Sequence, residues 1–233
     1  MDKPLIVIPT YNEIESLPLV LAQLSEVEVL VVDDNSPDGT GEWAQQFADT
    51  HPWCRVLHRE SKGGLAGAYL AGFNYALEHG YRVVGQLDAD GSHDPAEIGR
   101  LWARLHLPDQ PAGVIGSRWV RGGRVRGWPL SRHLLSRLGN RYIRLALRMP
   151  IKDATAGFRL YRTSVLAEVL GELQMAGYGF QVEMTYRLVR RGYRLAEVPT
   201  TFRERRAGSS KMSAGIAIEQ LVQVTRWAVQ PRR

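Results

Sequence analysis

The chain has 233 residues, of which 44% are hydrophobic and 23% are charged, proportions that are typical of a globular protein and unlike a disordered or fibrous one. Its single cysteine, Cys54, excludes an intramolecular disulfide and a cysteine-based metal site. No run reaches the roughly 18 consecutive apolar residues that cross a bilayer, so we expect no membrane-spanning segment. The net charge of +6 predicts an anionic partner, which composition alone leaves open among nucleic acid, a membrane surface and a phosphorylated substrate.

The predicted elements of the first half alternate between strands and helices. We expect strands at 5–8, 29–32, 55–58, 81–87 and 113–115, helices at 14–24, 40–48 and 95–105, and a further helix through Leu70, Phe73 and Leu77. This alternation predicts an α/β fold with right-handed βαβ units, in which a mostly parallel sheet is flanked by helices.

The second half begins within a strongly basic segment, because no acidic residue stands between Asp109 and Asp153. A helix is predicted at 132–149, where apolar residues recur at helical spacing beside a second stripe of arginines. We favour core packing for the apolar stripe, and the alternative is a basic amphipathic helix on a membrane surface. The apolar residues are Leu135, Leu138, Tyr142, Leu145 and Met149, and the arginines are Arg137, Arg141, Arg144 and Arg148. A helix at 180–190, a strand at 194–198 and a final helix at 213–229 complete the chain.

Polar residues follow the predicted strands where ligands bind in such sheets, beyond the carboxyl ends of the strands. The most informative are Asp88 and Asp90, because two carboxylates this close repel each other unless a cation joins them. A hard cation such as Mg²⁺ or Mn²⁺, shared with substrate phosphates, fits this pair and predicts a nucleotide-using transferase. The alternative is a solvated Asp-x-Asp turn.

Asp34 follows the second predicted strand and can accept hydrogen bonds from a base or a ribose. A turn or helix cap is its alternative role, which Asp33 or Asp38 would fill equally well. The segment 62–67, Lys-Gly-Gly-Leu-Ala-Gly, offers a cation and a close backbone approach, although glycine turns of this kind are common.

The ordered motifs of residues 4–212 resemble those of the family 2 inverting glycosyltransferases, above all the polyprenyl-phosphate (dolichyl-phosphate) mannose synthases. The motifs are Pro-Thr-Tyr-Asn-Glu at 9–13, Val-Val-Asp-Asp-Asn-Ser-Pro-Asp-Gly-Thr at 31–40, Asp-Ala-Asp at 88–90, Gly-Ser-Arg at 116–118, Trp-Pro-Leu at 128–130, Asp-Ala-Thr-Ala-Gly-Phe at 153–158 and Gly-Ser-Ser-Lys at 208–211. The resemblance implies a GT-A fold, GDP-mannose as the donor and a polyprenyl phosphate as the acceptor. It also implies one domain over 1–233, with a nucleotide-sugar half (1–117), an acceptor half (118–212) and a C-terminal amphipathic helix (213–233).

The resemblance also assigns roles to individual residues. It places Pro9, Tyr11, Glu13, Val32 and Asp34 around the nucleoside, and Asp88, Ala89 and Asp90 around the ribose, the diphosphate and an Mg²⁺ or Mn²⁺ ion. It places Arg205 and Lys211 on the donor's phosphates, and Arg118, Arg132 and Ser136 on the acceptor phosphate. The chain departs from the pattern at Ser92, where relatives often have a glutamine that binds the metal, so a water or His93 would complete the coordination.

A phosphate monoester is already anionic near neutral pH, so we expect direct displacement with inversion at the anomeric carbon, without a general base. The prenyl tail predicts peripheral attachment to the cytoplasmic face of a membrane, through the helix at 137–148, the C-terminal helix, or a membrane-anchoring partner. Alternatives are a polyprenyl-phosphate glucosyltransferase, another family 2 enzyme, or a non-enzymatic lipid- or nucleic-acid-binding protein. Nucleic acid is disfavoured because the arginines lack a nucleic-acid motif, and a dehydrogenase because 9–13 lacks Gly-x-Gly-x-x-Gly.

Overall fold

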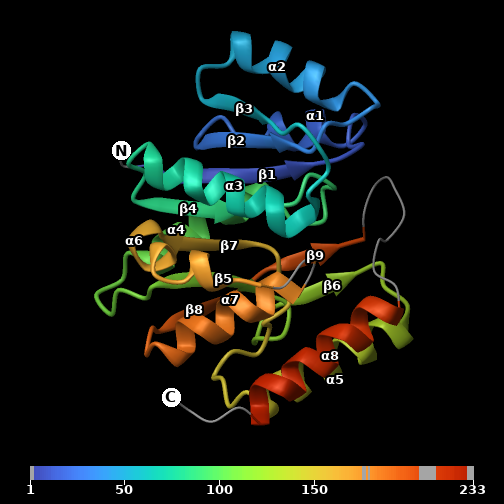
Figure 1. Ribbon diagram of the computed structural model, residues 1–233, viewed down its shortest axis with the longest axis vertical. Coiled ribbons are helices and arrows are strands. Elements are labelled where there is room, and N and C mark those ends of the chain that lie inside the picture. Colours follow the sequence, from blue (N-terminus) through green and yellow to red (C-terminus); the bar gives the residue numbers. More distant parts are fainter. Residues whose placement is uncertain (1–2, 175–176, 178, 205–213, 230–233) are drawn as a thin grey trace.

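A seven-stranded sheet forms the centre of the molecule in the computed structural model, which describes residues 3–174, 177, 179–204 and 214–229, with side chains described from 221 onward in the last range (Figure 1). The strand order is β3-β2-β1-β4-β7-β5-β8. The strands are β1 (Leu5–Thr10), β2 (Glu28–Asp33), β3 (Cys54–His58), β4 (Val83–Gln86), β5 (Gly113–Ser117), β7 (Arg159–Arg162) and β8 (Leu195–Pro199). A separate two-stranded sheet joins β6 (Arg124–Arg126) to β9 (Thr201–Arg203).

The predicted mostly parallel sheet is confirmed, with one antiparallel strand that the sequence did not reveal. Strands β1, β2, β3 and β4 are parallel neighbours, and β5 is parallel to β8. Between these two groups lies β7, which is antiparallel to both β4 and β5. Because β7 joins the two groups, residues from both halves of the chain meet at the end of the sheet where the parallel strands have their carboxyl ends.

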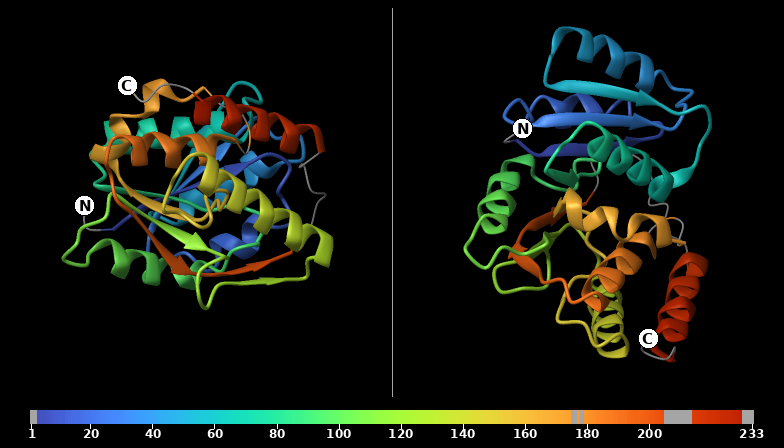
Figure 2. Two further views of the ribbon diagram at one scale, coloured as in Figure 1. Left: turned by 90° about the horizontal axis from the view of Figure 1, so that it is seen from below. Right: turned by 60° about the vertical axis from the view of Figure 1, so that its left-hand side comes forward.

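Helices cover both faces of the sheet (Figures 1 and 2). One face packs against α1 (Leu17–Leu21), α2 (Thr40–Thr50) and α4 (Ile98–Leu105), the last preceded by the 3-10 turn η1 (Pro95–Glu97). The other face packs against α3 (Gly64–Glu78), α6 (Thr163–Ala167) and α7 (Gly179–Arg190), with the 3-10 turn η2 (Leu170–Glu172) following α6. The remaining helices are α5 (Leu130–Ala146) and α8 (Ala214–Val229).

Alternation along the strands divides the core into two layers. In β1, Ile6 and Ile8 belong to the layer beneath α1, α2 and α4, whereas Leu5 and Val7 belong to the layer beneath α3 and α7. All four are fully buried. Helices cover β1 on both sides, so its side chains are apolar on both faces, as expected of a strand in a parallel sheet.

The outer pair of helices, α5 and α8, packs beside α7 on a third apolar cluster that includes Ile143, Val224 and Trp227 (Figure 1). The favoured interpretation of the α5 stripe as core was wrong. Leu135, Leu138 and Leu145 are 67%, 55% and 64% exposed, because α5 turns its other side toward this cluster. Tyr142 is also exposed, and only Met149, beyond the end of the helix, is buried.

Element boundaries shift most at the first helix, which was predicted at 14–24 and covers only Leu17–Leu21. Proline is favoured in the first turn of a helix, and Pro18 fixes the start there. Among the described residues, no helix combines the length and apolarity needed to cross a bilayer.

Candidate active site

A cavity of about 220 Å³ opens at the carboxyl ends of β1, β2 and β4. Its lining comes from the end of β1, from the loops after these strands, from the start of α3 and from Gly177. Most of the residues predicted for the donor line it, namely Pro9, Tyr11, Glu13, Asp34, Asp88, Ala89 and Asp90. Val32 does not, because it is fully buried in the core layer beneath α3. Arg205 and Lys211 lie outside the described residues.

Hydrogen bonds join the loop after β1 to the loop after β2. The Thr10 hydroxyl donates to Asp33 Oδ1 at 2.8 Å, and Asp33 Oδ2 accepts the backbone N–H of Ser36 at 2.9 Å. Asp38 accepts the backbone N–H and the hydroxyl of Thr40 at 3.0 and 2.6 Å. Asp33 and Asp38 therefore form the turn between β2 and α2, and Asp34 itself accepts the backbone N–H groups at the start of α3, which is the capping role that was its alternative.

Asp34 lies on the cavity wall and is 3% exposed. Its Oδ1 accepts a hydrogen bond from the Arg59 guanidinium, and its Oδ2 accepts the backbone N–H groups of Gly63 and Gly64 at 3.0 and 2.8 Å. These contacts bring the glycine turn over the cavity. A carboxylate has about four acceptor positions, so one remains for a ligand donor.

The glycine turn also places Lys62 at the cavity, where its Nζ lies 3.7 Å from the centroid of the Tyr11 ring. This cation–π contact holds a positive charge beside the predicted nucleoside pocket. The lysine is thus positioned to attract the anionic part of a donor.

Asp88 is held between α3 and the loop that precedes β7. Its Oδ1 accepts a hydrogen bond from the Tyr69 hydroxyl at 2.9 Å. On the other side lies Gly157, where an added Cβ would come within 3.2 Å of Asp88 Oδ2. Burial, reinforced by the negative charge of Asp88, raises the pKa of Tyr69 well above its ordinary value, so the hydroxyl remains a hydrogen-bond donor.

Asp90 lies on the cavity wall, whereas Ser92 and His93, the two residues after the following glycine, do not line this cavity. Asp90 Oδ1 accepts the backbone N–H of Ser92 at 2.9 Å. Ser92 Oγ and His93 Nδ1 are buried without a hydrogen-bond partner among the described residues. Burial lowers the pKa of His93 to about 4, so its ring is neutral at pH 7 and able to bind a metal.

These residues fit a divalent metal by the kind of donor atoms that they offer. Asp88 and Asp90 offer the carboxylate oxygens that Mg²⁺ and Mn²⁺ prefer, and Ser92 offers a neutral oxygen. Within the described ranges, no group of three or more His, Cys, Asp or Glu side chains is arranged to hold an ion by itself. Any ion bound here would take further ligands from substrate phosphates or water, as Mg²⁺ usually does.

A second cavity, of about 330 Å³, shares Asp90 with the first. It lies between α1, the loop before η1 and the end of β9, and its charged lining includes Glu15, Asp94 and Arg203. The predicted nucleoside residues do not line it.

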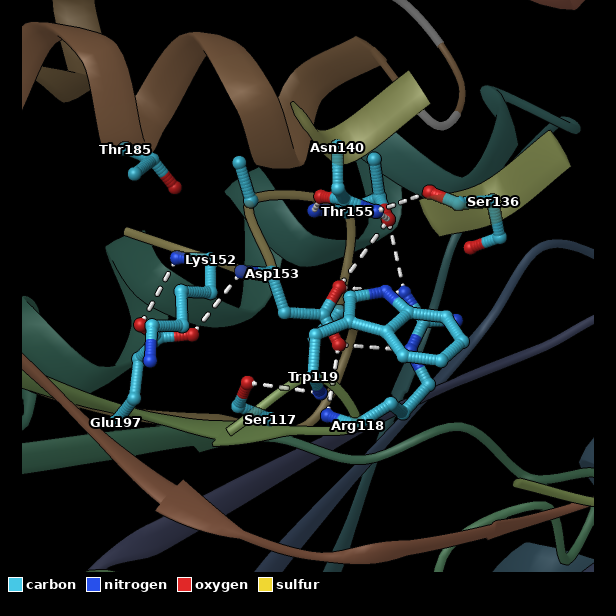
Figure 3. A network of polar contacts seen from close by, with 12 residues as sticks. Ser117, Arg118, Trp119, Ser136, Asn140, Lys152, Asp153, Thr155, Thr185 and Glu197 are labelled. Carbon is cyan, nitrogen blue, oxygen red and sulfur yellow. Dashed lines mark hydrogen bonds and ion pairs between the residues drawn. The ribbon is translucent and has the colours of Figure 1, made fainter. Parts of the chain in front are cut away.

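Arg118, at the end of β5, is 8% exposed and is paired with the fully buried Asp153 (Figure 3). Its Nε and Nη2 donate to the two Asp153 oxygens at 2.8 and 2.6 Å, and its backbone N–H donates at 2.8 Å. Burial alone would raise the pKa of Asp153, but Arg118 outweighs that effect and lowers it. The sequence predicted Arg118 in a phosphate site without predicting that a carboxylate holds it.

The loop after α5 connects Arg118 to Ser136 (Figure 3). The Thr155 hydroxyl accepts from Arg118 Nη2 at 2.8 Å and from Asn140 Nδ2 at 2.9 Å. Asn140 Nδ2 also donates to the backbone carbonyl of Ser136 at 3.1 Å. Two of the three predicted acceptor residues thus belong to one hydrogen-bond network.

Trp128 brings the third predicted acceptor residue, Arg132, to the same place. Its ring centroid lies 4.2 Å from the Arg132 guanidinium carbon and 5.6 Å from that of Arg118. Arg132 also forms an ion pair with Glu204 at 3.5 Å. Both guanidinium groups are paired with a carboxylate, but the Arg132–Glu204 pair is long and partly exposed, so Arg132 is the cation better able to exchange its carboxylate for an anionic ligand.

Sequence reasoning missed the residues that hold the predicted ones in place. Thr155 and Asn140 were not singled out, because their partners are distant in the chain. Trp128 appeared only within a motif. The Asp153–Gly157 motif did point to this loop, but its contacts with Arg118 and Asp88 emerge only in the fold.

The model of the family described as "Glycosyl transferase family 2" matches residues 5–170, which is most of the chain. The chain belongs to glycosyl transferase family 2. Among its curated relatives is an undecaprenyl-phosphate mannosyltransferase of Micrococcus luteus, which is 51% identical over 98% of this chain and 95% of the relative. Another is a polyprenol monophosphomannose synthase of Mycolicibacterium smegmatis, which is 46% identical over 99% of this chain and 89% of the relative.

Solved structures of similar shape bear out the GT-A fold. Glucosyl-3-phosphoglycerate synthase of Mycobacterium tuberculosis, in complex with Mn²⁺, UDP and phosphoglyceric acid, has a TM-score of 0.74 at 18% identity, covering 98% of this chain and 80% of that one. A mannosyltransferase of Pyrobaculum calidifontis, in complex with GDP-Man and Mn²⁺, has a TM-score of 0.59 at 20% identity, covering 89% of this chain and 58% of that one. At this identity the likeness concerns the fold alone.

Proposed function

We propose that this glycosyltransferase transfers mannose from GDP-mannose to a polyprenyl phosphate, giving polyprenyl phosphate β-mannose and GDP. The observation that carries the proposal is the pair of relatives at 51% and 46% identity, both named for mannosyl transfer to a polyprenyl phosphate and both matched over nearly the whole chain. The two neighbouring sites at the edge of the sheet support it, since one suits a nucleotide and the other an anion.

The donor half of the proposal places GDP-mannose in the cavity of about 220 Å³. Asp34 would accept a hydrogen bond from the nucleoside, and Tyr11 would flank it. Lys62 would lie near the diphosphate, where Arg205 and Lys211 are proposed to add positive charge. Val32, buried beneath the cavity, would act through its backbone or through the position of β2.

Asp88 and Asp90 are proposed to hold an Mg²⁺ or Mn²⁺ ion, with Ser92 as a neutral oxygen ligand. A water or His93 would complete the coordination. The ion would supply positive charge against the diphosphate of the departing GDP. Asp90 is oriented for this role by the Ser92 backbone, and Asp88 by Tyr69. Both carboxylates are therefore preorganised by the protein.

The acceptor phosphate is proposed to bind beside Arg118, Arg132 and Ser136. One of its oxygens attacks the anomeric carbon, forming the new C–O bond while the bond from that carbon to the GDP oxygen breaks. The electron pair leaves with GDP, and the configuration inverts. The acceptor is already an anion, so no base is needed, and the arginines orient the phosphate.

The proposed organisation follows from these assignments. Residues 1–117 supply the donor site, 118–212 supply the acceptor site and 213–233 supply a C-terminal amphipathic helix, all in one domain. Because the acceptor is a membrane lipid and the donor a nucleotide sugar, we place the protein peripherally on the cytoplasmic face of a membrane.

The proposal is tested by incubating the purified chain with polyprenyl phosphate, Mg²⁺ or Mn²⁺, and labelled GDP-mannose, UDP-glucose or UDP-galactose in separate reactions. We expect label to enter an organic-soluble, mild-acid-labile product from GDP-mannose alone. Label from UDP-glucose alone would instead establish the polyprenyl-phosphate glucosyltransferase, and no product from any donor would refute the enzymatic assignment.

A further inference from the structure

An exposed apolar face covers the outer side of α5. Five leucines of this helix are each more than half exposed, and Tyr142 lies among them. The leucines are Leu130, Leu134, Leu135, Leu138 and Leu145. On α8, which packs beside α5, the exposed Leu221, Val222 and Val229 add further apolar surface. We call these residues the leucine face.

Helix geometry shows that this face is directed away from the protein. At about 100° per residue, the mean direction of the five leucines lies roughly 175° from that of the buried Asn140 and Ile143. The exposed Arg137, Arg141 and Arg144 are centred about 80° to one side of the leucines. An apolar stripe opposite the core, with cations along one edge, is typical of a helix that lies in a membrane interface.

The positive charge of α5 indicates what kind of partner the leucine face binds. Between Asp109 and Asp153 the chain has no acidic residue, so no negative charge on α5 offsets its arginines. We propose that the leucine face docks on an anionic lipid bilayer, with the leucines among the acyl chains and Arg137, Arg141 and Arg144 at the phosphates. The inference rests on the proposed function in one respect, that the acceptor is a lipid.

The same helix carries the proposed acceptor site on its other side. Arg132 and Ser136 lie on the turns whose side chains point away from the leucine face, and Ser136 belongs to the Arg118 network. Docking through the leucines would therefore hold the acceptor site just above the lipid phosphates. A polyprenyl phosphate would reach Arg118 and Arg132 without leaving the membrane.

The test is sedimentation of the full chain with phosphatidylcholine vesicles that either contain or lack phosphatidylglycerol. We expect binding only to the anionic vesicles and its loss at high salt. The variant L134Q/L138Q/L145Q changes exposed side chains only, and should lower the partition coefficient by at least about tenfold. The matched control L107Q, an exposed leucine after α4, should bind like the wild type.

Transfer to a short-chain, water-soluble prenyl phosphate without vesicles separates docking from catalysis. The triple variant should keep the wild-type rate in this assay. If it binds vesicles as the wild type does, the docking surface is refuted. A wild-type dimer that the triple variant converts to monomer, with vesicle binding unchanged, would assign the face to a second copy of the chain and also refute the proposal. Vesicle binding without any transfer activity would refute the proposed function alone.

A second inference rests on the network behind Arg118 (Figure 3). The Thr155 hydroxyl accepts from Arg118 and Asn140 and donates to Asp153 Oδ1 at 3.3 Å. A hydroxyl has one donor and two acceptor positions, so all three are used. Asn140 uses both of its side-chain N–H donors in this network, and its Oδ1 accepts the Thr155 backbone N–H at 3.4 Å.

We infer that Thr155 and Asn140 are positioning residues that fix Arg118 relative to the Ser136 turn of α5. They do not lie on the donor cavity, so their effect is expected on the acceptor phosphate alone. Removing the Thr155 hydroxyl would leave Arg118 paired with Asp153 but free to shift relative to α5.

The test compares Thr155→Val, which removes the hydroxyl at constant shape, with Thr155→Ser, which keeps it. We expect Thr155→Val to raise the KM for polyprenyl phosphate about tenfold with the GDP-mannose KM unchanged, and Thr155→Ser to restore the wild-type value. A loss of thermal stability without this split in KM would mean a merely structural role and refute the inference. Arg132→Ala serves as the reference: if it too leaves the acceptor KM unchanged, the acceptor site itself is misplaced.

Discussion

Asp90 is 4% exposed, and its Oδ1 accepts a hydrogen bond from the backbone N–H of Ser92. Replacing Asp90 with Ala removes one of the two proposed metal carboxylates but no apolar packing. We therefore expect the rate of mannosyl transfer to fall by at least about a thousandfold, because a metal ion that stabilises the charge on the departing GDP lowers the barrier by several kcal/mol. The melting temperature should change little. Initial rates and circular dichroism melting measure both. Asp49→Ala, at an exposed position of α2, is the control, and an active Asp90→Ala enzyme would refute the metal role.

Because of Asp153, we expect the free energy of unfolding to fall at acidic pH. Its folded pKa is lowered from 3.8 by Arg118, which outweighs the effect of burial. As the pH falls, the unfolded chain therefore binds the proton first, so the stabilisation is complete above pH 3.8 and is lost as the pH falls through the folded pKa. Urea unfolding between neutral pH and pH 3 should show this loss.

The Asp153→Asn variant isolates the contribution of this carboxylate. It leaves Arg118 buried without its counterion, so we expect the free energy of unfolding to fall by about 3–5 kcal/mol at pH 7. The difference from the wild type should shrink below pH 3.8. A constant difference at every pH would contradict the assignment.

Arg132 is more accessible than Arg118, and its 3.5 Å ion pair with Glu204 is partly exposed. Arg132→Ala should therefore fold normally and raise the KM for polyprenyl phosphate about tenfold or more, with little effect on the GDP-mannose KM, since a charge-assisted hydrogen bond is worth about 1.5–3 kcal/mol. Steady-state kinetics with each substrate varied measure the two constants. Arg121→Ala, a nearby exposed arginine, is the control, and an equal change in both constants would count against a phosphate role.

Single residues were predictable where they follow strands. Asp34, Asp88 and Asp90 were found because the carboxyl ends of parallel strands gather at one edge, and the structure brings all three to one cavity. Thr155 and Asn140 were not found, because they are 15 residues apart in the chain and meet only when α5 packs against the loop.

At the scale of elements, β7 shows why sequence pattern failed. Its residues are Arg-Leu-Tyr-Arg, a polar pattern, yet Arg159 is fully buried. The Arg159 guanidinium donates to the carbonyls of Ala154 and Ala156 at 2.6 Å, so its hydrogen-bonding groups are satisfied without water. The apolar signal of this strand is reduced to Leu160 and Tyr161 between two arginines, which is too short to indicate a buried strand.

Helix α5 shows a different limit. Its periodicity correctly predicted the helix and the apolar stripe, but a stripe does not reveal what covers it. Ile143 and Asn140 face the protein instead, on the side of the helix that looked more polar.

The packing of α3 on β1 depends on a glycine. A Cβ added at Gly72 would lie 2.4 Å from Val7 Cγ1, so Gly72→Ala forces the helix away from the sheet. We expect a loss of about 1–3 kcal/mol in the free energy of unfolding, as is usual for overpacking. Urea unfolding measures it. Gly99→Ala in α4, where an added Cβ meets nothing within 4 Å, is the control and should be neutral or stabilising. Equal stability of the two variants would contradict the tight approach.

At the scale of the whole molecule, the loop between Asp153 and Gly157 connects the two proposed substrate sites. Asp153 holds Arg118 at one end, and Gly157 lies against Asp88 at the other. The antiparallel β7 that follows places this loop between the donor and acceptor halves. In the proposed mechanism, this short loop would set the position of the attacking phosphate relative to the carboxylates that face the leaving group.

The most direct measurement is a crystal structure of the chain with GDP and Mn²⁺, recorded at a wavelength that locates manganese by anomalous scattering. The account predicts the guanosine in the cavity lined by Tyr11 and Asp34, and a manganese peak between the diphosphate and Asp88 and Asp90. Nucleotide bound in the larger cavity beside Glu15 and Arg203, or GDP bound with no manganese at the two aspartates, would contradict it.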